Sequence, residues 1–293
     1  MRLLSILCLV LMILGGCSGS QKDDRPAIAV SFEPQAWMLR QIVGDDFDIV
    51  TLLPAGSDPE TYQPSISTMK SLGKADIYFT LGTDGFEKSN LAGIVSNFPD
   101  LKVVDCTEGV QKITGTHGHH DHDGHNHDGE EFDPHILASI KNSIIIADNL
   151  SRYLAKNYPD KADAYLRAGN SLKARFKWKD DSISKMNLDG TAFAIRHPSL
   201  SYFARDYNLK QISMQDNGKE TTPLRLAMQM KEIKDSGAKV FVNEIEHDSH
   251  SYKETASEVG LNVVDVKLNG PAWEEFIMKL AQRMKMANEI NRN

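Results

Sequence analysis

Residues 160–188 read DKADAYLRAGNSLKARFKWKDDSISKMNL. Apolar side chains recur in this stretch at spacings of seven, four, seven and three residues, and lysines, arginines and aspartates fill the positions between them. The apolar positions are Tyr165, Leu172, Phe176, Ile183 and Met186. This spacing puts them on one face of a helix. The stretch therefore predicts one long amphipathic helix in the middle of the chain.

The sequence on both sides of this helix alternates short apolar runs with helical patterns. Upstream, strands are predicted at 27–30, 48–53, 77–81 and 101–105, and helices around 35–43, 66–72 and 134–157. Downstream, strands are predicted at 192–195, 240–243 and 263–266, and helices near 198–207, 252–259 and 272–288. This alternation is typical of parallel sheets with crossover helices. We predict an α/β fold of two parallel-sheet lobes joined by one long rigid helix, with a ligand cleft between them.

The sequence predicts five consecutive segments along the chain. In order, it predicts a signal peptide at 1–16, a tether at 17–25, an N-terminal α/β lobe at 26–158, a linking helix at 159–188 and a C-terminal α/β lobe at 189–293. A His-rich loop at 116–131 interrupts the N-terminal lobe.

The N-terminus has the features of an export signal. Met1 and Arg2 precede an apolar run at 3–14, which is too short to cross a bilayer as a permanent helix. The sequence LGGC that ends at Cys17 resembles the bacterial lipobox, in which the cysteine is acylated and becomes the first mature residue. An ordinary secretory signal is the alternative. We expect a lipid-anchored protein of the bacterial cell envelope that faces the periplasm or the cell exterior.

Charge and cysteine content narrow the classes of partner. The formal net charge of −7 and the lack of a basic cluster argue against nucleic acid and suit a cationic ligand. Cys8 would leave with the signal peptide and Cys17 would be lipidated, so that only Cys106 remains. No intrachain disulfide is then possible.

A tract rich in histidine and aspartate indicates a transition metal. Its histidines are His117, His119, His120, His122, His125 and His127, six of the ten in the chain. Such a tract cannot pack in a core, but imidazoles and carboxylates bind zinc. We expect it to act as a flexible outer collector or sensor of metal, and the alternative is a tolerated insertion with incidental affinity.

Further candidate ligands lie where the predicted strands end. Ligands collect beyond the carboxyl ends of parallel strands. Glu60 follows the strand at 48–53, His197 and Glu244 end two later strands, and Asp265 lies in the last strand. Each of them taken alone could be an ordinary surface or structural residue. Their joint occurrence with the His-rich tract points to a metal site.

His135 is the remaining candidate and is predicted to lie in the first turn of a helix. Asp133 would be the N-cap of this helix and Pro134 would lie in its first turn. The positive end of the helix dipole disfavours imidazolium, so that His135 would stay neutral and able to coordinate a metal.

Three linked motifs resemble a known family. They are LLPAGSDPETYQP at 52–64, the His-rich tract followed by DPHI at 133–136, and IRHPSLSYFARDYNL at 195–209. In the same order they are similar to LVPPGxDPHxYxP, a His/Asp-rich insertion before DPHI, and TSHDAFxYLAxxYGL. These are motifs of the solute-binding proteins of zinc and manganese ABC importers. The resemblance runs from the signal to the C-terminus, and the two lobes and backbone helix of that family agree with the pattern above.

The resemblance implies a set of metal ligands. Glu60, His135 and His197 match the ligand positions of the family, and Asp265 is the nearest match to its fourth ligand. Another alignment, anchored on Trp273, puts Lys267 there instead, and Glu244 would support the site from outside the first shell of ligands. Zinc is the expected metal. Because Glu60 replaces the usual histidine and a carboxylate also suits harder cations, manganese or iron are alternatives.

The function that the resemblance implies is capture of a divalent metal outside the cytoplasm and its delivery to an ABC permease. The protein would act as a monomer held at the membrane by its lipid, and would not be an enzyme. One alternative is a periplasmic zinc buffer or adhesin with no transport role. The other is a zinc hydrolase with Glu60 as general base, but the sequence has no HExxH pair or GxSxG elbow.

Overall fold

The computed structural model describes residues 25–57, 62–82, 85–114, 132–215, 222–246 and 250–290. Several predicted features lie outside these ranges. They are the signal peptide with Cys17, the candidate ligand Glu60, and the six histidines of the tract between His117 and His127.

The N-terminal half forms a four-stranded parallel sheet. Its order is β2 (Asp48–Leu53), β1 (Ala27–Phe32), β3 (Ala75–Thr80) and β4 (Lys102–Asp105). The central strand β1 is buried along almost its whole length, as is typical of parallel strands covered on both faces. The helices of this half are α2 (Glu33–Val43), α3 (Ile66–Leu72) and α4 (Phe86–Asn97).

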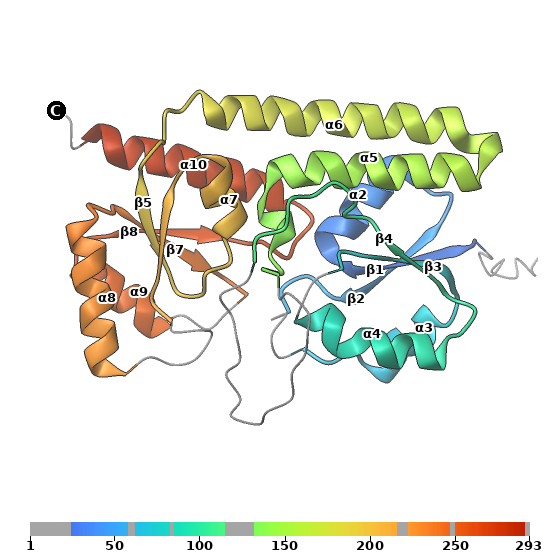
Figure 1. Ribbon diagram of the computed structural model, residues 1–293, viewed down its shortest axis with the longest axis horizontal. Coiled ribbons are helices and arrows are strands. Elements are labelled where there is room, and N and C mark those ends of the chain that lie inside the picture. The colour runs from blue at the N-terminus through green and yellow to red at the C-terminus, as the bar shows by residue number, and fades with distance from the viewer. Residues whose placement is uncertain are drawn as a thin grey trace, which may run out of the picture.

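The C-terminal half repeats this arrangement. Its parallel sheet has the order β6 (Lys210–Ser213), β5 (Ala192–Ile195), β7 (Val240–Glu244) and β8 (Asn262–Val266). Its helices are α7 (Ser201–Asp206), α8 (Pro223–Asp235), α9 (His250–Glu258) and α10 (Trp273–Ile290). Two parallel sheets of the same strand order confirm the predicted α/β fold (Figure 1).

The long helix predicted in the middle of the chain is α6 (Ala162–Ser184). It is preceded by α5 (Ile140–Asn157) and a short 3₁₀ turn, η2 (Pro159–Lys161), and α5 runs back along it (Figure 1). The two helices approach so closely at Gly169 that an added Cβ would lie 2.4 Å from the Ser151 side chain. The pair packs on α2 of the N-terminal half, and α6 also contacts α10 of the C-terminal half.

The two halves contact each other directly, in addition to being connected through α6. Helix α10 also packs on α6, and one hydrophobic core contains both Val30 of β1 and Val242 of β7. The predicted residue boundaries of the two lobes stay predictions.

The start of the helix after the His-rich tract was predicted wrongly. The chain forms a 3₁₀ turn, η1 (Ile136–Ala138), and only then α5. Ser139 has extended backbone angles and its Oγ accepts a hydrogen bond from the Asn142 N–H at 2.9 Å, so Ser139 and not Asp133 is the N-cap. His135 therefore precedes a short 3₁₀ turn, and the argument from the dipole of an α-helix does not apply to it.

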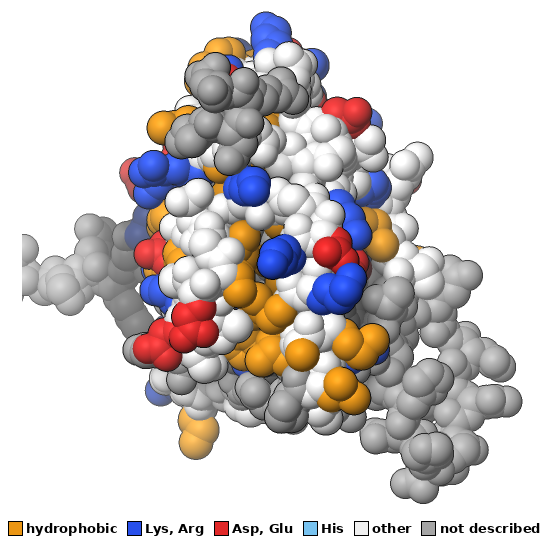
Figure 2. Space-filling view, turned by 90° about the vertical axis from the view of Figure 1, so that its left-hand side faces the viewer, with side chains coloured by type: hydrophobic (Ala, Val, Ile, Leu, Met, Phe, Trp, Pro, Cys, Tyr) orange, Lys and Arg blue, Asp and Glu red, His pale blue; other side chains and the backbone are white. Residues whose placement is uncertain are grey.

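The end of the C-terminal half that carries α8 exposes apolar side chains. Leu224 and Met228, one helical turn apart, are 75% and 59% exposed. Figure 2 looks onto this end and shows hydrophobic side chains gathered between lysines and arginines. None of the helices in the described ranges is long and apolar enough to cross a membrane.

Candidate metal centre

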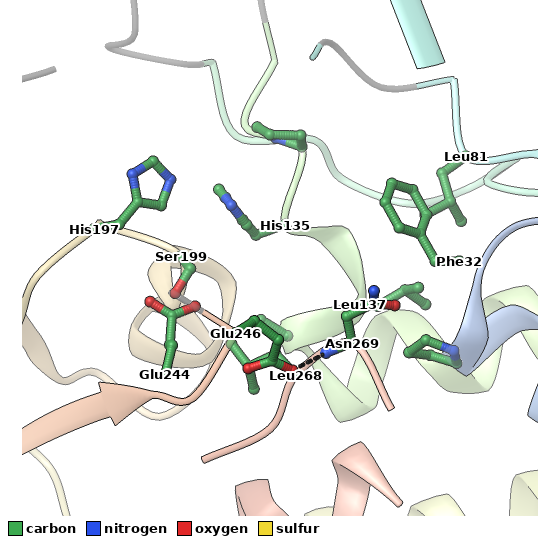
Figure 3. Close-up of a pocket in the computed structure, with 13 residues that line it drawn as sticks. Phe32, Leu81, His135, Leu137, His197, Ser199, Glu244, Glu246, Leu268 and Asn269 are labelled. Carbon is green, nitrogen blue, oxygen red and sulfur yellow. Dashed lines mark hydrogen bonds between the residues drawn. The ribbon is translucent and has the colours of Figure 1, made fainter. Parts of the chain in front are cut away.

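Both halves of the molecule contribute walls to a pocket of about 90 Å³ (Figure 3). Four strands end at this pocket. Phe32 ends β1, Leu81 directly follows β3, His197 follows β5, and Glu244 ends β7. His135 lines it from the segment before η1. The pocket is thus at the carboxyl ends of the strands, where parallel sheets bind their ligands.

His135 and His197 lie side by side in the pocket. Their ring centroids are 5.0 Å apart, and the ring planes make an angle of 64°. His197 is 5% exposed, whereas the side chain of His135 is 22% exposed. Neighbouring imidazoles in a largely buried site suit a divalent transition metal, because neutral histidine is a good ligand for zinc.

Asp133 orients the ring of His135. One oxygen of its carboxylate, Oδ1, accepts hydrogen bonds from the His135 backbone N–H at 2.8 Å and from ring Nδ1 at 2.9 Å. A proton on Nδ1 puts the imidazole lone pair on Nε2, and such carboxylate–histidine pairs are common behind metal ligands. Burial raises the pKa of Asp133, but the charge of protonated His135 and the hydrogen bonds outweigh burial and lower it to about 2. Asp133 is therefore held as a carboxylate beside protonated His135.

Replacing Asp133 with asparagine is expected to weaken zinc binding about 10- to 100-fold, because the amide keeps the shape but not the charge that orients His135. Competition with a chromophoric chelator would measure this. Asp180→Asn is the matched control, because Asp180 is also buried and accepts a hydrogen bond from the Tyr207 hydroxyl at 3.0 Å, but does not line the pocket. An equal loss of affinity in both variants would contradict the role given to Asp133.

Two glutamates also line the pocket. Glu244, which was predicted to support the site, is 7% exposed at the end of β7. Glu246 was not singled out from the sequence, and its Oε1 accepts a hydrogen bond from the Asn269 N–H at 2.8 Å. Its position two residues beyond a strand that ends in a candidate ligand is the signal that could have identified it.

Asp265 does not line the pocket. Its side chain is 59% exposed on the edge strand β8, where Oδ1 accepts a hydrogen bond from Asn243 Nδ2 at 2.6 Å and lies 3.8 Å from Lys253 Nζ. Lys267, the alternative at this place, is not a lining residue either. The structure thus brings Glu244, and not Asp265, to the pocket that contains the two histidines.

The described part of the chain contains no group of three histidine, cysteine, aspartate or glutamate residues placed to hold a metal ion. What it brings together is the histidine pair, with two carboxylates in the walls of the same pocket. Glu60, the candidate third ligand, lies outside the described residues.

Comparison with known proteins gives one family. The family model described as zinc-uptake complex component A, periplasmic, matches residues 28–285. The zinc-binding lipoprotein AdcA of Streptococcus pneumoniae (strain ATCC BAA-255 / R6) is 27% identical over 237 residues, which cover 75% of this chain and 45% of that protein. The zinc-binding protein AdcA of Streptococcus pyogenes serotype M3 (strain ATCC BAA-595 / MGAS315) is 28% identical over 258 residues, 82% of this chain and 49% of that protein.

This chain thus spans about half the length of these curated relatives. A crystal structure of ZnuA superposes with a TM-score of 0.80 at 26% identity, covering 90% of this chain and 99% of that one. The match to the family model runs through both sheets and both histidines of the pocket. The chain belongs to the family of the periplasmic component A of zinc-uptake complexes.

Proposed function

We propose that the protein is the extracytoplasmic metal-binding component of an ABC importer, which captures zinc between its lobes and delivers it to a membrane permease. The observation that carries the proposal is the histidine pair, His135 and His197, in a pocket whose walls come from both halves of the chain. Family membership and the zinc-binding relatives support the same function. A protein that binds a metal needs only side chains that can coordinate it. The proposed function therefore includes no catalysed reaction.

The proposed ligands are His135 and His197 through ring nitrogens, and Glu60 through its carboxylate on the strength of its sequence motif. Glu244 is a better candidate for the fourth ligand than Asp265, because Glu244 lines the pocket and Asp265 is exposed at a sheet edge. Two nitrogens with one or two carboxylates suit four-coordinate zinc. The carboxylates also admit manganese or iron, so that availability and geometry would decide among these metals.

Contacts between the halves support a carrier that changes shape little. The Tyr202 hydroxyl donates to the Asp133 carbonyl at 2.9 Å and accepts from the Ile113 N–H at 3.1 Å. These two bonds connect α7, a helix of the C-terminal half, to Ile113 before the His-rich tract and to Asp133 after it. Together with the continuous helix α6, they favour small adjustments of the pocket over a wide hinge motion.

We also propose that Cys17 carries a lipid after removal of a signal peptide at 1–16, and that residues 17–25 tether a monomer to the membrane. The LGGC sequence supports this, as does the name of the pneumococcal relative, which is a lipoprotein. The protein would then work at the bacterial cell envelope, next to its permease.

Deleting residues 117–127 is expected to leave one tight zinc site and to remove several weak ones. The tract contains six histidines, whereas the two histidines of the pocket lie elsewhere in the chain. Isothermal titration with zinc would count the sites before and after deletion. Loss of the tight site together with the tract would contradict the assignment of the pocket.

Metal content measured by mass spectrometry, after competition among zinc, manganese and iron for the mature protein, tests the proposed function. One equivalent of tightly held metal is the expected result. Poor growth of a deletion strain under zinc limitation, with rescue by added zinc, would distinguish import from buffering or adhesion. Normal growth of that strain would contradict a role in import.

A further inference from the structure

Asn269 lines the pocket from the segment between β8 and α10 and is 7% exposed. Its backbone N–H donates to Glu246 Oε1 at 2.8 Å, the bond drawn as a dashed line in Figure 3. Asn269 is therefore fixed to a carboxylate that itself lines the pocket from the C-terminal half.

The side chain of Asn269 reaches across to the N-terminal half. Its Nδ2 donates to the carbonyl oxygen of Pro54 at 3.1 Å and to that of Ser57 at 3.5 Å. Its Oδ1 accepts from the Glu33 N–H at 3.3 Å, and its backbone carbonyl accepts from the Gly56 N–H at 3.2 Å. A side-chain amide supplies both donors and an acceptor, so that no apolar or carboxylate side chain of similar size could make this set of bonds.

The two segments that Asn269 binds are both part of the metal site or lead to it. Residues 54–57 form a turn closed by the Ser57 N–H and the Pro54 carbonyl at 3.1 Å, with Gly56 at the positive φ of 81° that a type II turn requires. In sequence, this turn lies within the motif at 52–64 that also contains Glu60. Glu33 stands between Phe32 and Pro34, which both line the pocket.

We propose that Asn269 is a positioning residue that holds the two halves together across the pocket and thereby slows the release of bound metal. The inference rests on the proposed function. With its amide engaged by backbone groups, Asn269 acts on the walls of the pocket and not as a ligand. Without these bonds, the turn at 54–57 and the start of α2 separate more readily from Glu246, and the metal escapes faster.

Two variants test this role. Asn269→Leu keeps the branched shape of the side chain but removes its hydrogen bonds, and Asn269→Ala removes both the shape and the bonds. The matched control is Asn149→Leu, because Asn149 Nδ2 also donates to two carbonyls, of Cys106 at 3.0 Å and Glu108 at 2.8 Å, but both lie on the N-terminal side of α6. Stopped-flow mixing of the zinc-loaded mature protein with excess chelator gives the rate of release, and mixing with zinc gives the rate of association.

Both Asn269 variants are expected to release zinc about tenfold faster, a factor that corresponds to about 1.4 kcal/mol, with association rates unchanged within about threefold. Asn149→Leu is expected to match the wild type in both rates. A general loss of packing would not speed release while leaving association unchanged. It would also not distinguish the Asn269 variants from Asn149→Leu.

Hydrogen exchange of the zinc-free protein supplies a readout that does not depend on metal. Exchange at the Glu33 amide and across residues 54–57 should be faster in the Asn269 variants and unchanged in Asn149→Leu. Wild-type release rates in both Asn269 variants, or equal acceleration in Asn149→Leu, would overturn the inference and leave the proposed function intact. A wild-type protein that binds no zinc would overturn the proposed function itself.

Discussion

Replacing His197 with alanine is expected to lower the affinity for zinc by more than about 100-fold. Loss of a group that only orients a ligand costs about 10- to 100-fold, and loss of a ligand should cost more. His197 is almost fully buried beside His135, so that no water-exposed side chain can easily take its place. Equilibrium competition with chelators of graded affinity would measure the change, and His135→Ala is expected to behave alike.

Ser199→Ala is the control for substitution within the pocket. Ser199 lines the same pocket and is 1% exposed, and its hydroxyl has no hydrogen-bond partner within the described part of the chain. Removing this oxygen should change zinc affinity by less than about threefold. Full affinity in His197→Ala would contradict the proposed centre, and an equal loss in Ser199→Ala would show that any disturbance of the pocket is enough.

The secondary structure was predicted correctly wherever burial leaves a clear period in the sequence. The helix at 160–188 is α6, and four of its five predicted apolar positions are buried within it, whereas Met186 lies just beyond its end. Strands such as β1 and β7 are buried on both faces and read as continuous apolar runs. Two such series of strands, separated by one long helix, were enough to predict two lobes.

Elements with a weak apolar pattern were missed. Strand β6 is an edge strand with one buried residue, Ile212, and α4 buries few of its side chains. Helix α8 also has few buried positions, but it begins with a signal that was overlooked. Thr222 precedes Pro223, and its hydroxyl accepts from the Arg225 N–H at 3.3 Å, as an N-cap does.

The site could be predicted only in part, because its geometry depends on packing between elements far apart in the chain. Strand ends and motifs identified His135, His197 and Glu244, but the 5.0 Å between the two rings depends on how η1 and α7 pack. Asp265 was the nearest match to the family's fourth ligand, yet β8 lies at the edge of its sheet and leaves this side chain exposed. A sequence does not reveal which strand is the edge.

Replacing Trp273 with alanine is expected to lower the free energy of unfolding by about 3–5 kcal/mol, the usual cost of truncating a large buried aromatic side chain. Trp273 is fully buried at the start of α10, and its ring centroid lies 5.4 Å from that of Trp37 and 5.8 Å from that of Phe176. These contacts join α10 to α2 and α6. Urea unfolding followed by circular dichroism would measure the change in midpoint at an unchanged slope.

Trp178→Ala is the matched control, because Trp178 is 64% exposed on α6 and its loss should change stability by no more than about 0.5 kcal/mol. Equal destabilisation by both substitutions would contradict the role of Trp273 as a joint between the halves.

Trp273→Phe separates the packing of the aromatic ring from the hydrogen bond of the indole N–H. Phenylalanine keeps an aromatic ring against Trp37 and Phe176 but loses the indole Nε1–H, which donates to the Leu137 carbonyl at 2.9 Å. Leaving a buried carbonyl without its donor costs about 1–3 kcal/mol, so this variant should fall between the wild type and Trp273→Ala. Leu137 lies in η1, two residues after His135, and itself lines the pocket. A variant that unfolds like the wild type but binds zinc more weakly would therefore show that the bond serves the metal centre more than the fold.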